Sequence, residues 1–125
     1  MTDFSGRSIL LAEDEPIVAM MVEDMLLDLG ARVIGPAASV GKALDLARAG
    51  GIDAAVLDVN LNGETCHPIV DVLRAAGVPM VVATGYDQPD LGDRTGIELI
   101  QKPYRREHLA AAVERALAAS RSAKV

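Results

Sequence analysis

The chain has 125 residues, enough for one domain with a buried core, and half of them are hydrophobic. Its net charge of −6, with two tyrosines, one phenylalanine and no tryptophan, argues against nucleic-acid binding and against non-specific attraction to anionic lipid. No apolar run reaches the roughly 18 residues of a membrane span, and a single cysteine, Cys66, cannot form an internal disulfide, so we expect a cytoplasmic protein without membrane association.

The first predicted elements are a strand and a helix. Residues 8–12 form a continuous apolar run that stops at three acids (residues 13–15), which is the pattern of a strand buried on both faces. Pro16 suits the first turn of a helix, because its missing N–H costs little there, and Gly30 suits the end of that helix. Hydrophobic residues recur between them at helical spacing, and we expect an inward face made of Ile17, Val18, Met21, Val22, Met25, Leu26 and Leu29.

The second strand and helix, and the third strand, follow. Residues 32–35 predict a short strand, and we expect Ser39 to cap a helix that ends at Ala49. The inward residues of that helix should be Val40, Ala43, Leu44 and Ala47. Residues 54–57 predict the third strand, which again ends in an acid, Asp58.

The same alternation continues in the second half. We expect the third helix over residues 68–76 and the fourth strand over residues 78–83, with Thr84 at its end. Residues 86–96 are polar and contain a proline and glycines, so any helix there should be short. The fifth strand should cover residues 97–101.

The last predicted element is a helix over residues 105–120. We expect it to bury Leu109, Ala112, Val113, Ala116 and Leu117, and we expect the final five residues to form a frayed tail. The chain shows no internal repeat and no linker. We therefore expect a single domain over residues 1–125, with a core over about 8–119 and no output domain.

Five strands that alternate with five helical segments predict an α/β fold: a doubly wound, five-stranded parallel sheet flanked by helices. Ligands of such sheets bind at the carboxyl ends of the strands. The polar residues that follow strands one, three, four and five are Glu13, Asp14, Asp58, Thr84 and Lys102. We expect all of them at one edge of the sheet, which we call the rim.

The rim should attract a cation. Three carboxylates in one place raise each other's pKa unless a cation neutralises them. Oxygen ligands of this kind suit Mg²⁺ or Mn²⁺, which also keep waters and phosphate oxygens as ligands. Zinc does not fit, because Cys66 and His67 are expected at the start of the third helix, away from the rim.

The remaining rim residues suit a phosphoryl group. Lys102 offers a point charge for phosphate oxygens, and Thr84 offers a rotatable hydroxyl. A carboxylate can form an acyl phosphate as the nucleophile. Asp58 is the best candidate, because it ends the central strand.

These residues resemble the receiver domains of two-component response regulators, and the resemblance covers residues 8–119. The matching segments are 11–16 (LAEDEP), 56–61 (VLDVNL), 83–85 (ATG) and 101–104 (QKPY). Each segment alone is weak evidence, but the four in this order are specific. The resemblance implies a flavodoxin-like fold with the strand order 2-1-3-4-5.

The resemblance also implies a role for each rim residue. Asp58 would be the phosphoacceptor, and Glu13 and Asp14 would be the acidic pair around the metal. The backbone carbonyl of Asn60 would complete the metal ligands that the protein supplies. Thr84 and Lys102 would bind phosphoryl oxygens, and the peptide bond between Lys102 and Pro103 would be cis.

Two positions depart from the usual receiver pattern. Many receivers carry an aromatic switch residue three positions before the lysine, where this chain has Leu99. An aromatic residue, Tyr86, instead follows the threonine and glycine, which is similar to an atypical receiver subgroup nicknamed "FAT GUY". The match is partial, since Met80 and Val82 replace phenylalanines of that motif. We hypothesise that Tyr86 moves on phosphorylation in place of the fifth-strand aromatic.

The resemblance implies a stand-alone response regulator of a phosphorelay. A sensor histidine kinase or a histidine phosphotransfer protein would donate the phosphoryl group to Asp58, with Mg²⁺ bound. The chain would then alter protein–protein contacts or act as a phosphate shuttle or sink. It would catalyse its own phosphorylation and dephosphorylation, and it would not be an enzyme for a separate substrate.

Three alternatives belong to other classes. A receiver fold that has kept only protein interactions would reject phosphoryl donors. An aspartate-based phosphatase would need an acid two residues after the nucleophile, where this chain has Asn60. A nucleotide-binding protein would carry a glycine-rich phosphate loop, and neither usual motif is present.

Overall fold

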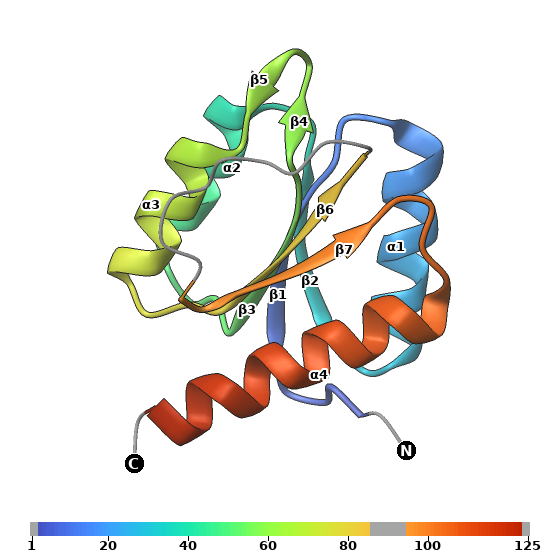
Figure 1. Cartoon of the computed structure of the whole chain (residues 1–125), viewed down its shortest axis with the longest axis vertical. Coiled ribbons are helices and arrows are strands. Elements are labelled where there is room, and N and C mark those ends of the chain that lie inside the picture. Colours follow the sequence, from blue (N-terminus) through green and yellow to red (C-terminus); the bar gives the residue numbers. More distant parts are fainter. Residues whose placement is uncertain (1–2, 86–94, 124–125) are drawn as a thin grey trace.

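The computed structural model describes residues 3–85 and 95–123. Its main element is a five-stranded parallel sheet in the order β2-β1-β3-β6-β7 (Figure 1). The strands are β1 (Ser8–Ala12), β2 (Arg32–Ala37), β3 (Ala54–Asp58), β6 (Met80–Thr84) and β7 (Ile97–Gln101). Counted along the chain without the two short strands β4 and β5, this is the predicted order 2-1-3-4-5. The predicted fold class is confirmed.

Helices cover both faces of the sheet. The described helices are α1 (Pro16–Asp28), α2 (Val40–Ala49), α3 (His67–Ala75) and α4 (Arg106–Ala123). Helices α1 and α4 lie on one face, and α2 and α3 lie on the other (Figure 1). The predicted short helix within residues 86–96 falls almost entirely outside the described residues and stays a prediction. No described helix has both the length and the apolar character needed to cross a bilayer.

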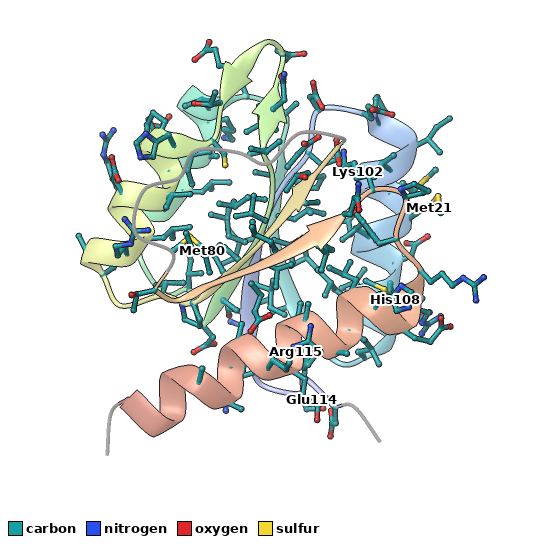
Figure 2. All side chains as sticks on the ribbon, viewed as in Figure 1. Met21, Met80, Lys102, His108, Glu114 and Arg115 are labelled. Atoms are coloured by element: carbon teal, nitrogen blue, oxygen red, sulfur yellow. The ribbon has the colours of Figure 1, made fainter. Side chains whose placement is uncertain are left out.

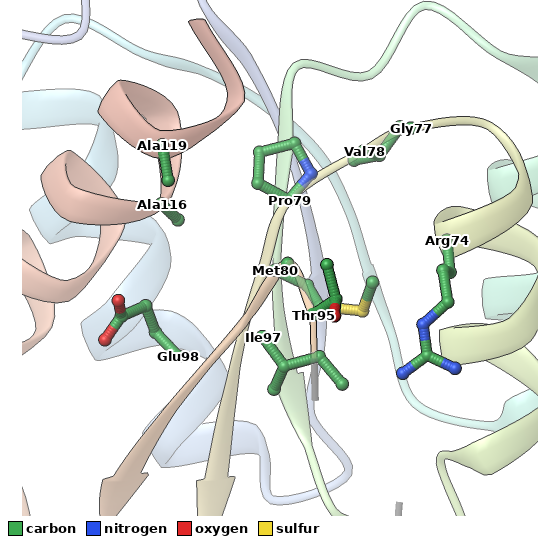
Figure 3. Close-up of a pocket in the computed structure, with 11 residues that line it drawn as sticks. Arg74, Gly77, Val78, Pro79, Met80, Thr95, Ile97, Glu98, Ala116 and Ala119 are labelled. Atoms are coloured by element: carbon green, nitrogen blue, oxygen red, sulfur yellow. The ribbon is translucent and has the colours of Figure 1, made fainter. Parts of the chain in front are cut away.

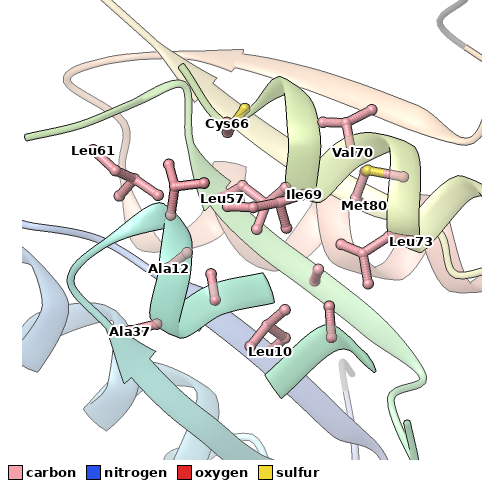
Figure 4. Packing of buried hydrophobic residues seen from close by; sticks show 14 of the residues in the cluster. Leu10, Ala12, Ala37, Leu57, Leu61, Cys66, Ile69, Val70, Leu73 and Met80 are labelled. Carbon is pink, nitrogen blue, oxygen red and sulfur yellow. The ribbon is translucent and has the colours of Figure 1, made fainter. Parts of the chain in front are cut away.

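Side chains alternate between the two faces along each strand and form two hydrophobic clusters. Leu10 and Leu57 point toward α2 and α3, where they pack against Ile69 and Leu73 (Figure 4). Leu11 and Val56 point the other way, into the cluster beneath α1 and α4. Because both faces of β1, β3 and β6 are covered, these strands are apolar at successive positions, and continuous apolar runs located their ends to within two residues.

The predicted inward face of α1 was partly wrong. Val22, Met25 and Leu26 are buried as predicted, but Ile17 is 69% exposed and Met21 is 64% exposed. The helix instead buries Ala19, which was not part of the predicted inward face. Because α1 is apolar almost all round, its hydrophobic period does not select one face.

Ser39 caps α2 as predicted, through its hydroxyl, which accepts a hydrogen bond from Lys42 N at 3.2 Å. The five predicted inward residues of α4 are all buried. The predicted frayed tail was wrong for residues 121–123, because α4 continues to Ala123. No glycine or proline follows Pro103, so nothing in the local sequence ends the helix earlier.

One element was not predicted: a small hairpin between β3 and α3. Strands β4 (Asn60–Leu61) and β5 (Glu64–Thr65) pair antiparallel. The two residues between them, Asn62 and Gly63, have φ values of 53° and 85°. Positive φ at both positions is the geometry of a tight type I′ turn, for which Asn-Gly is a preferred sequence. The hairpin rises beyond the carboxyl ends of the main strands (Figure 1).

Candidate functional site

The carboxyl ends of the strands bring the predicted site residues together. Asp58 and Thr84 are the last residues of β3 and β6, Glu13 and Asp14 follow β1, and Lys102 follows β7. Backbone hydrogen bonds continue the pairing past the strand ends, from Glu13 N to Ala37 O at 2.9 Å and from Lys102 N to Thr84 O at 2.7 Å. Figure 2 shows Lys102 beside this edge of the sheet, on the side of α1.

Three acids form a cluster at the rim. Carboxylate oxygens of Glu13, Asp14 and Asp58 lie within 4.8 Å of one another. Glu13 and Asp58 are only 4% and 7% exposed, whereas Asp14 lies partly in solvent. Carboxylates that are this close and this poorly hydrated need a positive partner.

Lys102 supplies one positive partner. Its Nζ lies 2.8 Å from Asp58 Oδ2 and 3.3 Å from Glu13 Oε1. Burial opposes the charge on this amine, but the hydrogen bonds and charges of Asp58 and Glu13 outweigh it and raise the pKa of Lys102. The side chain is therefore a fixed cation that contacts the candidate nucleophile.

Lysine alone does not neutralise the cluster. Burial, together with the neighbouring Asp58 carboxylate, raises the pKa of Glu13 from 4.5 to about 7. Glu13 therefore stays partly protonated near neutral pH, because a single amine faces two buried carboxylates. A divalent cation would remove this deficit, and three carboxylates match the all-oxygen ligand set of Mg²⁺ or Mn²⁺. The residues therefore fit the metal that the sequence predicted.

The hairpin holds the outer acid of the cluster. Asn62 N donates a hydrogen bond to Asp14 Oδ2 at 2.8 Å, and this bond holds the pKa of Asp14 below its ordinary value. The side chain of Asn62 donates from Nδ2 to Ala38 O at 3.1 Å. Asn62 was not predicted as a site residue, although the Asn62-Gly63 pair is a strong signal for a two-residue hairpin turn.

Asn60 and Thr84 also lie at the rim. Asn60 N donates to Asp58 Oδ1 at 3.1 Å, and the Asn60 side chain accepts a hydrogen bond from Gly63 N at 2.8 Å. Thr84 is buried, and its hydroxyl donates to Gly85 O at 3.2 Å. Metal ligation by the Asn60 carbonyl and phosphoryl binding by Thr84 stay predictions.

The remaining predicted residues have mixed outcomes. The peptide bond between Lys102 and Pro103 is cis, as predicted. Tyr86, the proposed switch residue, lies outside the described residues. Leu99 is half-buried on β7 and pairs with Val82 of β6. Tyr104 was not singled out, yet it is half-buried, and burial with the nearby Glu13 charge raises its pKa to about 12.

Cys66 and His67 begin α3, as predicted, and neither belongs to the acid cluster. Cys66 is buried, and this burial, with the Asp58 charge, raises the pKa of its thiol to about 11. His67 is exposed, with Nε2 3.8 Å from Asp71 Oδ1. A thiol that stays protonated and an exposed imidazole do not form a zinc site with the acids.

A groove and a smaller hollow lie next to the sheet among the residues that the structure describes. A groove of about 700 Å³ runs between α1 and the segment after β7 and reaches the rim at Lys102. A smaller hollow of about 390 Å³ lies at the opposite ends of β6 and β7, between α3 and α4 (Figure 3). The smaller hollow contains none of the predicted site residues. The larger one gives solvent access to Lys102.

Comparison with known proteins agrees with this geometry. The sequence profile of the response regulator receiver domain matches residues 9–114. A solution structure of SdrG from Sphingomonas melonis Fr1 is 41% identical, with a TM-score of 0.71, over 91% of this chain and 95% of that chain. SdrG from Pseudomonas melonis Fr1 in its BeF3-activated conformation is 36% identical, with a TM-score of 0.68, over 94% and 99% of the two chains.

Two curated regulators are similar in sequence. The phyllosphere-induced regulator PhyR of Methylorubrum extorquens is 31% identical over 124 residues, which is 95% of this chain and 46% of that protein. The transcriptional regulatory protein PdtaR of Mycobacterium tuberculosis is 29% identical over 116 residues, 89% of this chain and 57% of that protein. The chain thus spans about half the length of the curated relatives that it matches.

Proposed function

This chain belongs to the family of response regulator receiver domains, and on that premise we propose that it accepts a phosphoryl group on Asp58 beside a bound divalent cation. The observation that carries the proposal is the contact of 2.8 Å between Lys102 Nζ and Asp58 Oδ2, inside a cluster of three acids. A nucleophilic carboxylate, a fixed amine and a site for a cation are the parts that phosphoryl transfer to an acid requires.

The metal would be held by the carboxylates of Glu13, Asp14 and Asp58 and by the backbone carbonyl of Asn60. Mg²⁺ is the expected ion, and Mn²⁺ would fit the same oxygen ligands. When bound, it supplies positive charge next to the oxygens of the transferred group. The raised pKa of Glu13 supports this assignment, because a cation bound beside it would favour the ionised acid.

The protein's own residues would each have one task in the transfer. An oxygen of the Asp58 carboxylate forms a bond to phosphorus while the phosphorus–nitrogen bond of a phosphohistidine donor breaks. Lys102 stabilises the negative charge of the phosphoryl oxygens from its fixed position beside Asp58. Thr84, at the end of β6, donates its hydroxyl to another of these oxygens. Water later hydrolyses the acyl phosphate, so the chain acts on itself and not on a separate substrate.

The donor would be a sensor histidine kinase or a histidine phosphotransfer protein. The phosphorylated face would then bind a downstream protein, or the chain would serve as a phosphate shuttle or sink in a phosphorelay. The BeF3-activated conformation of SdrG supports this mechanism, because beryllofluoride is a tetrahedral analogue of a phosphoryl group. A cytoplasmic location and the lack of nucleic-acid and membrane partners remain predictions from composition and charge.

Intact mass spectrometry tests the proposal. The protein is incubated with acetyl phosphate and Mg²⁺, next to an Asp58→Ala variant and a sample with excess chelator. We expect one added phosphoryl group that requires both Asp58 and the metal. If neither acetyl phosphate nor a histidine-phosphorylated donor protein adds mass, an interaction module that works without phosphorylation becomes the better account.

A further inference from the structure

The β4–β5 hairpin is attached to two of the three acids of the cluster. At its base, Asn60 N donates to Asp58 Oδ1, and at its turn, Asn62 N donates to Asp14 Oδ2. The first contact joins residues two apart in the sequence, whereas the second joins residues 48 apart. Only the second therefore depends on where the turn of the hairpin is placed relative to β1.

The side chain of Asn62 fixes that placement. Its amide donates to Ala38 O at 3.1 Å, and the preceding residue, Ala37, accepts a hydrogen bond from Glu13 N at 2.9 Å. Asn62 thus joins the end of β2 to Asp14, while β2 is itself joined to Glu13. The residue adopts a φ of 53°, a left-handed conformation that asparagine tolerates better than most residues.

Asp14 needs such support more than the other two acids do. Glu13 and Asp58 are buried and contact Lys102, but Asp14 lies partly in solvent, where a carboxylate can sample several rotamers. Partners that orient a metal ligand raise metal affinity, because less conformational freedom is lost on binding. The hydrogen bond from Asn62 N to Oδ2 of Asp14 limits the rotation of this carboxylate.

We propose that Asn62 is a positioning residue of the metal site: it holds Asp14 in place through its main-chain N–H and ties the hairpin to Ala38 through its side chain. The inference rests on the proposed function, since it assumes that the acid cluster binds a divalent cation. It adds that metal affinity depends on a residue that does not touch the metal.

Two variants separate positioning from simple electrostatics. Asn62→Gly keeps the N–H and suits a positive φ, but removes the tie to Ala38. Asn62→Asp also tolerates this backbone, but places an acceptor against the Ala38 carbonyl oxygen and adds a negative charge near the site. Charge alone would make Asn62→Asp bind a cation more tightly, whereas positioning makes both variants bind it more weakly. Glu64→Gln is the matched control, because it changes one charge on the same hairpin.

The test is Mn²⁺ binding to the full chain, followed by electron paramagnetic resonance, with the melting temperature of the metal-free protein measured in parallel. We expect the Kd for Mn²⁺ to rise about 3- to 10-fold in both Asn62 variants, since the contacts are near the surface, and to change less than about twofold in Glu64→Gln. A purely structural role would lower the melting temperature and leave the Kd unchanged. If Asn62→Gly does not fold, the Kd of Asn62→Asp for Mn²⁺ decides between the two explanations: a higher Kd supports positioning, and a lower Kd supports charge alone.

Two results would overturn the inference, and they have different meanings. If the wild-type chain binds Mn²⁺ and either folded Asn62 variant binds it as tightly or more tightly, Asn62 does not position Asp14. If the wild-type chain binds no Mn²⁺ at millimolar concentration, the metal site of the proposed function fails together with the inference.

Discussion

The two sides of the rim hold their acids by different means. On the inner side, Glu13 and Asp58 are buried against Lys102, and the pKa of Glu13 is raised to about 7. On the outer side, Asp14 is partly exposed, bonds to the hairpin, and has a lowered pKa. Glu13 and Asp14 are neighbours in sequence, so burial and hydrogen bonding, and not residue type, set this difference.

This difference predicts different roles for the two sides of the rim. On the inner side, two buried carboxylates face a single amine, an imbalance that a cation would relieve, and one of these acids is Asp58, the proposed nucleophile. On the outer side, Asp14 is ionised at neutral pH, because the hydrogen bond from Asn62 N keeps its pKa low. Variants that change one group at a time should separate the roles of the two sides.

Removing the amine should damage the inner side most. In Lys102→Ala, the phosphoryl oxygens lose a fixed positive partner, so we expect the rate of phosphorylation by acetyl phosphate to fall about 100-fold or more. The rate is measured by intact mass over time at saturating Mg²⁺. Lys42→Ala, which removes an exposed lysine of α2, is the control and should react like the wild type. A wild-type rate of phosphorylation in Lys102→Ala would show that the amine takes no part in the transfer.

Neutralising the outer acid should affect the metal and little else. In Asp14→Asn, we expect the Kd for Mn²⁺ to rise about 10- to 100-fold, because one anionic ligand is lost. The melting temperature of the metal-free protein should stay close to that of the wild type, since Asp14 lies partly in solvent. Asp45→Asn, an exposed acid of α2, controls for net charge. Equal Mn²⁺ affinity in Asp14→Asn and wild type would place the cation elsewhere.

Removing the hydroxyl of Thr84, at the end of β6, should slow phosphorylation less than removing the amine of Lys102. Thr84→Ala removes one donor to the phosphoryl oxygens, and we expect phosphorylation to slow about tenfold. Thr84→Ser keeps the hydroxyl and should retain most of the rate. Thr65→Ala, which removes an exposed hydroxyl from β5, serves as the control. If Thr84→Ser is as slow as Thr84→Ala, the methyl group and its packing matter, and the hydroxyl does not.

The inner side should also make the stability of the metal-free protein depend on pH. The pKa of Glu13 is higher in the folded protein, about 7, than its ordinary value of 4.5. The folded state therefore binds this proton more tightly, and the stability gained is complete below about pH 4.5 and is lost as the pH rises through about 7.

We accordingly expect the melting temperature without metal to fall by a few degrees, on the order of 5 °C, between pH 5.5 and pH 8. Glu13→Gln should weaken this decline, because its amide does not titrate. Saturating Mg²⁺ at pH 8 should restore the melting temperature of the wild type by binding the ionised acids. A decline of the same size in Glu13→Gln would assign the pH dependence to another group.

Much of the fold and most of the rim could be predicted from the sequence, for a topological reason. Apolar runs that end abruptly at Asp58, Thr84 or the acids after Ala12 mark both a strand and its carboxyl end. In a parallel sheet those ends share one edge, so the rim follows from the order of the elements without any side-chain geometry. The contacts of Lys102 with Asp58 and Glu13 agree with that expectation.

The parts that were not predicted depend on information that local patterns lack. The exposed positions of Ile17 and Met21 follow from the packing of α1, which its nearly uniform hydrophobicity does not reveal. The hairpin is too short for a hydrophobic period, so it is visible only in the turn chemistry of Asn62-Gly63. The opposite pKa shifts of Glu13 and Asp14 require burial and hydrogen bonds from distant segments.

The measurement that tests the central claim most directly is chemical mapping of the phosphorylated residue. Borohydride reduces an aspartyl phosphate to homoserine and leaves free carboxylates unchanged, so peptide mass spectrometry after reduction locates the modified acid. The account predicts homoserine at position 58 in protein treated with a phosphoryl donor and Mg²⁺, and none when the metal is chelated. Homoserine at position 14, 5-hydroxynorvaline (the reduction product of a glutamyl phosphate) at position 13, or the absence of both products in protein that has gained phosphoryl mass, would contradict it.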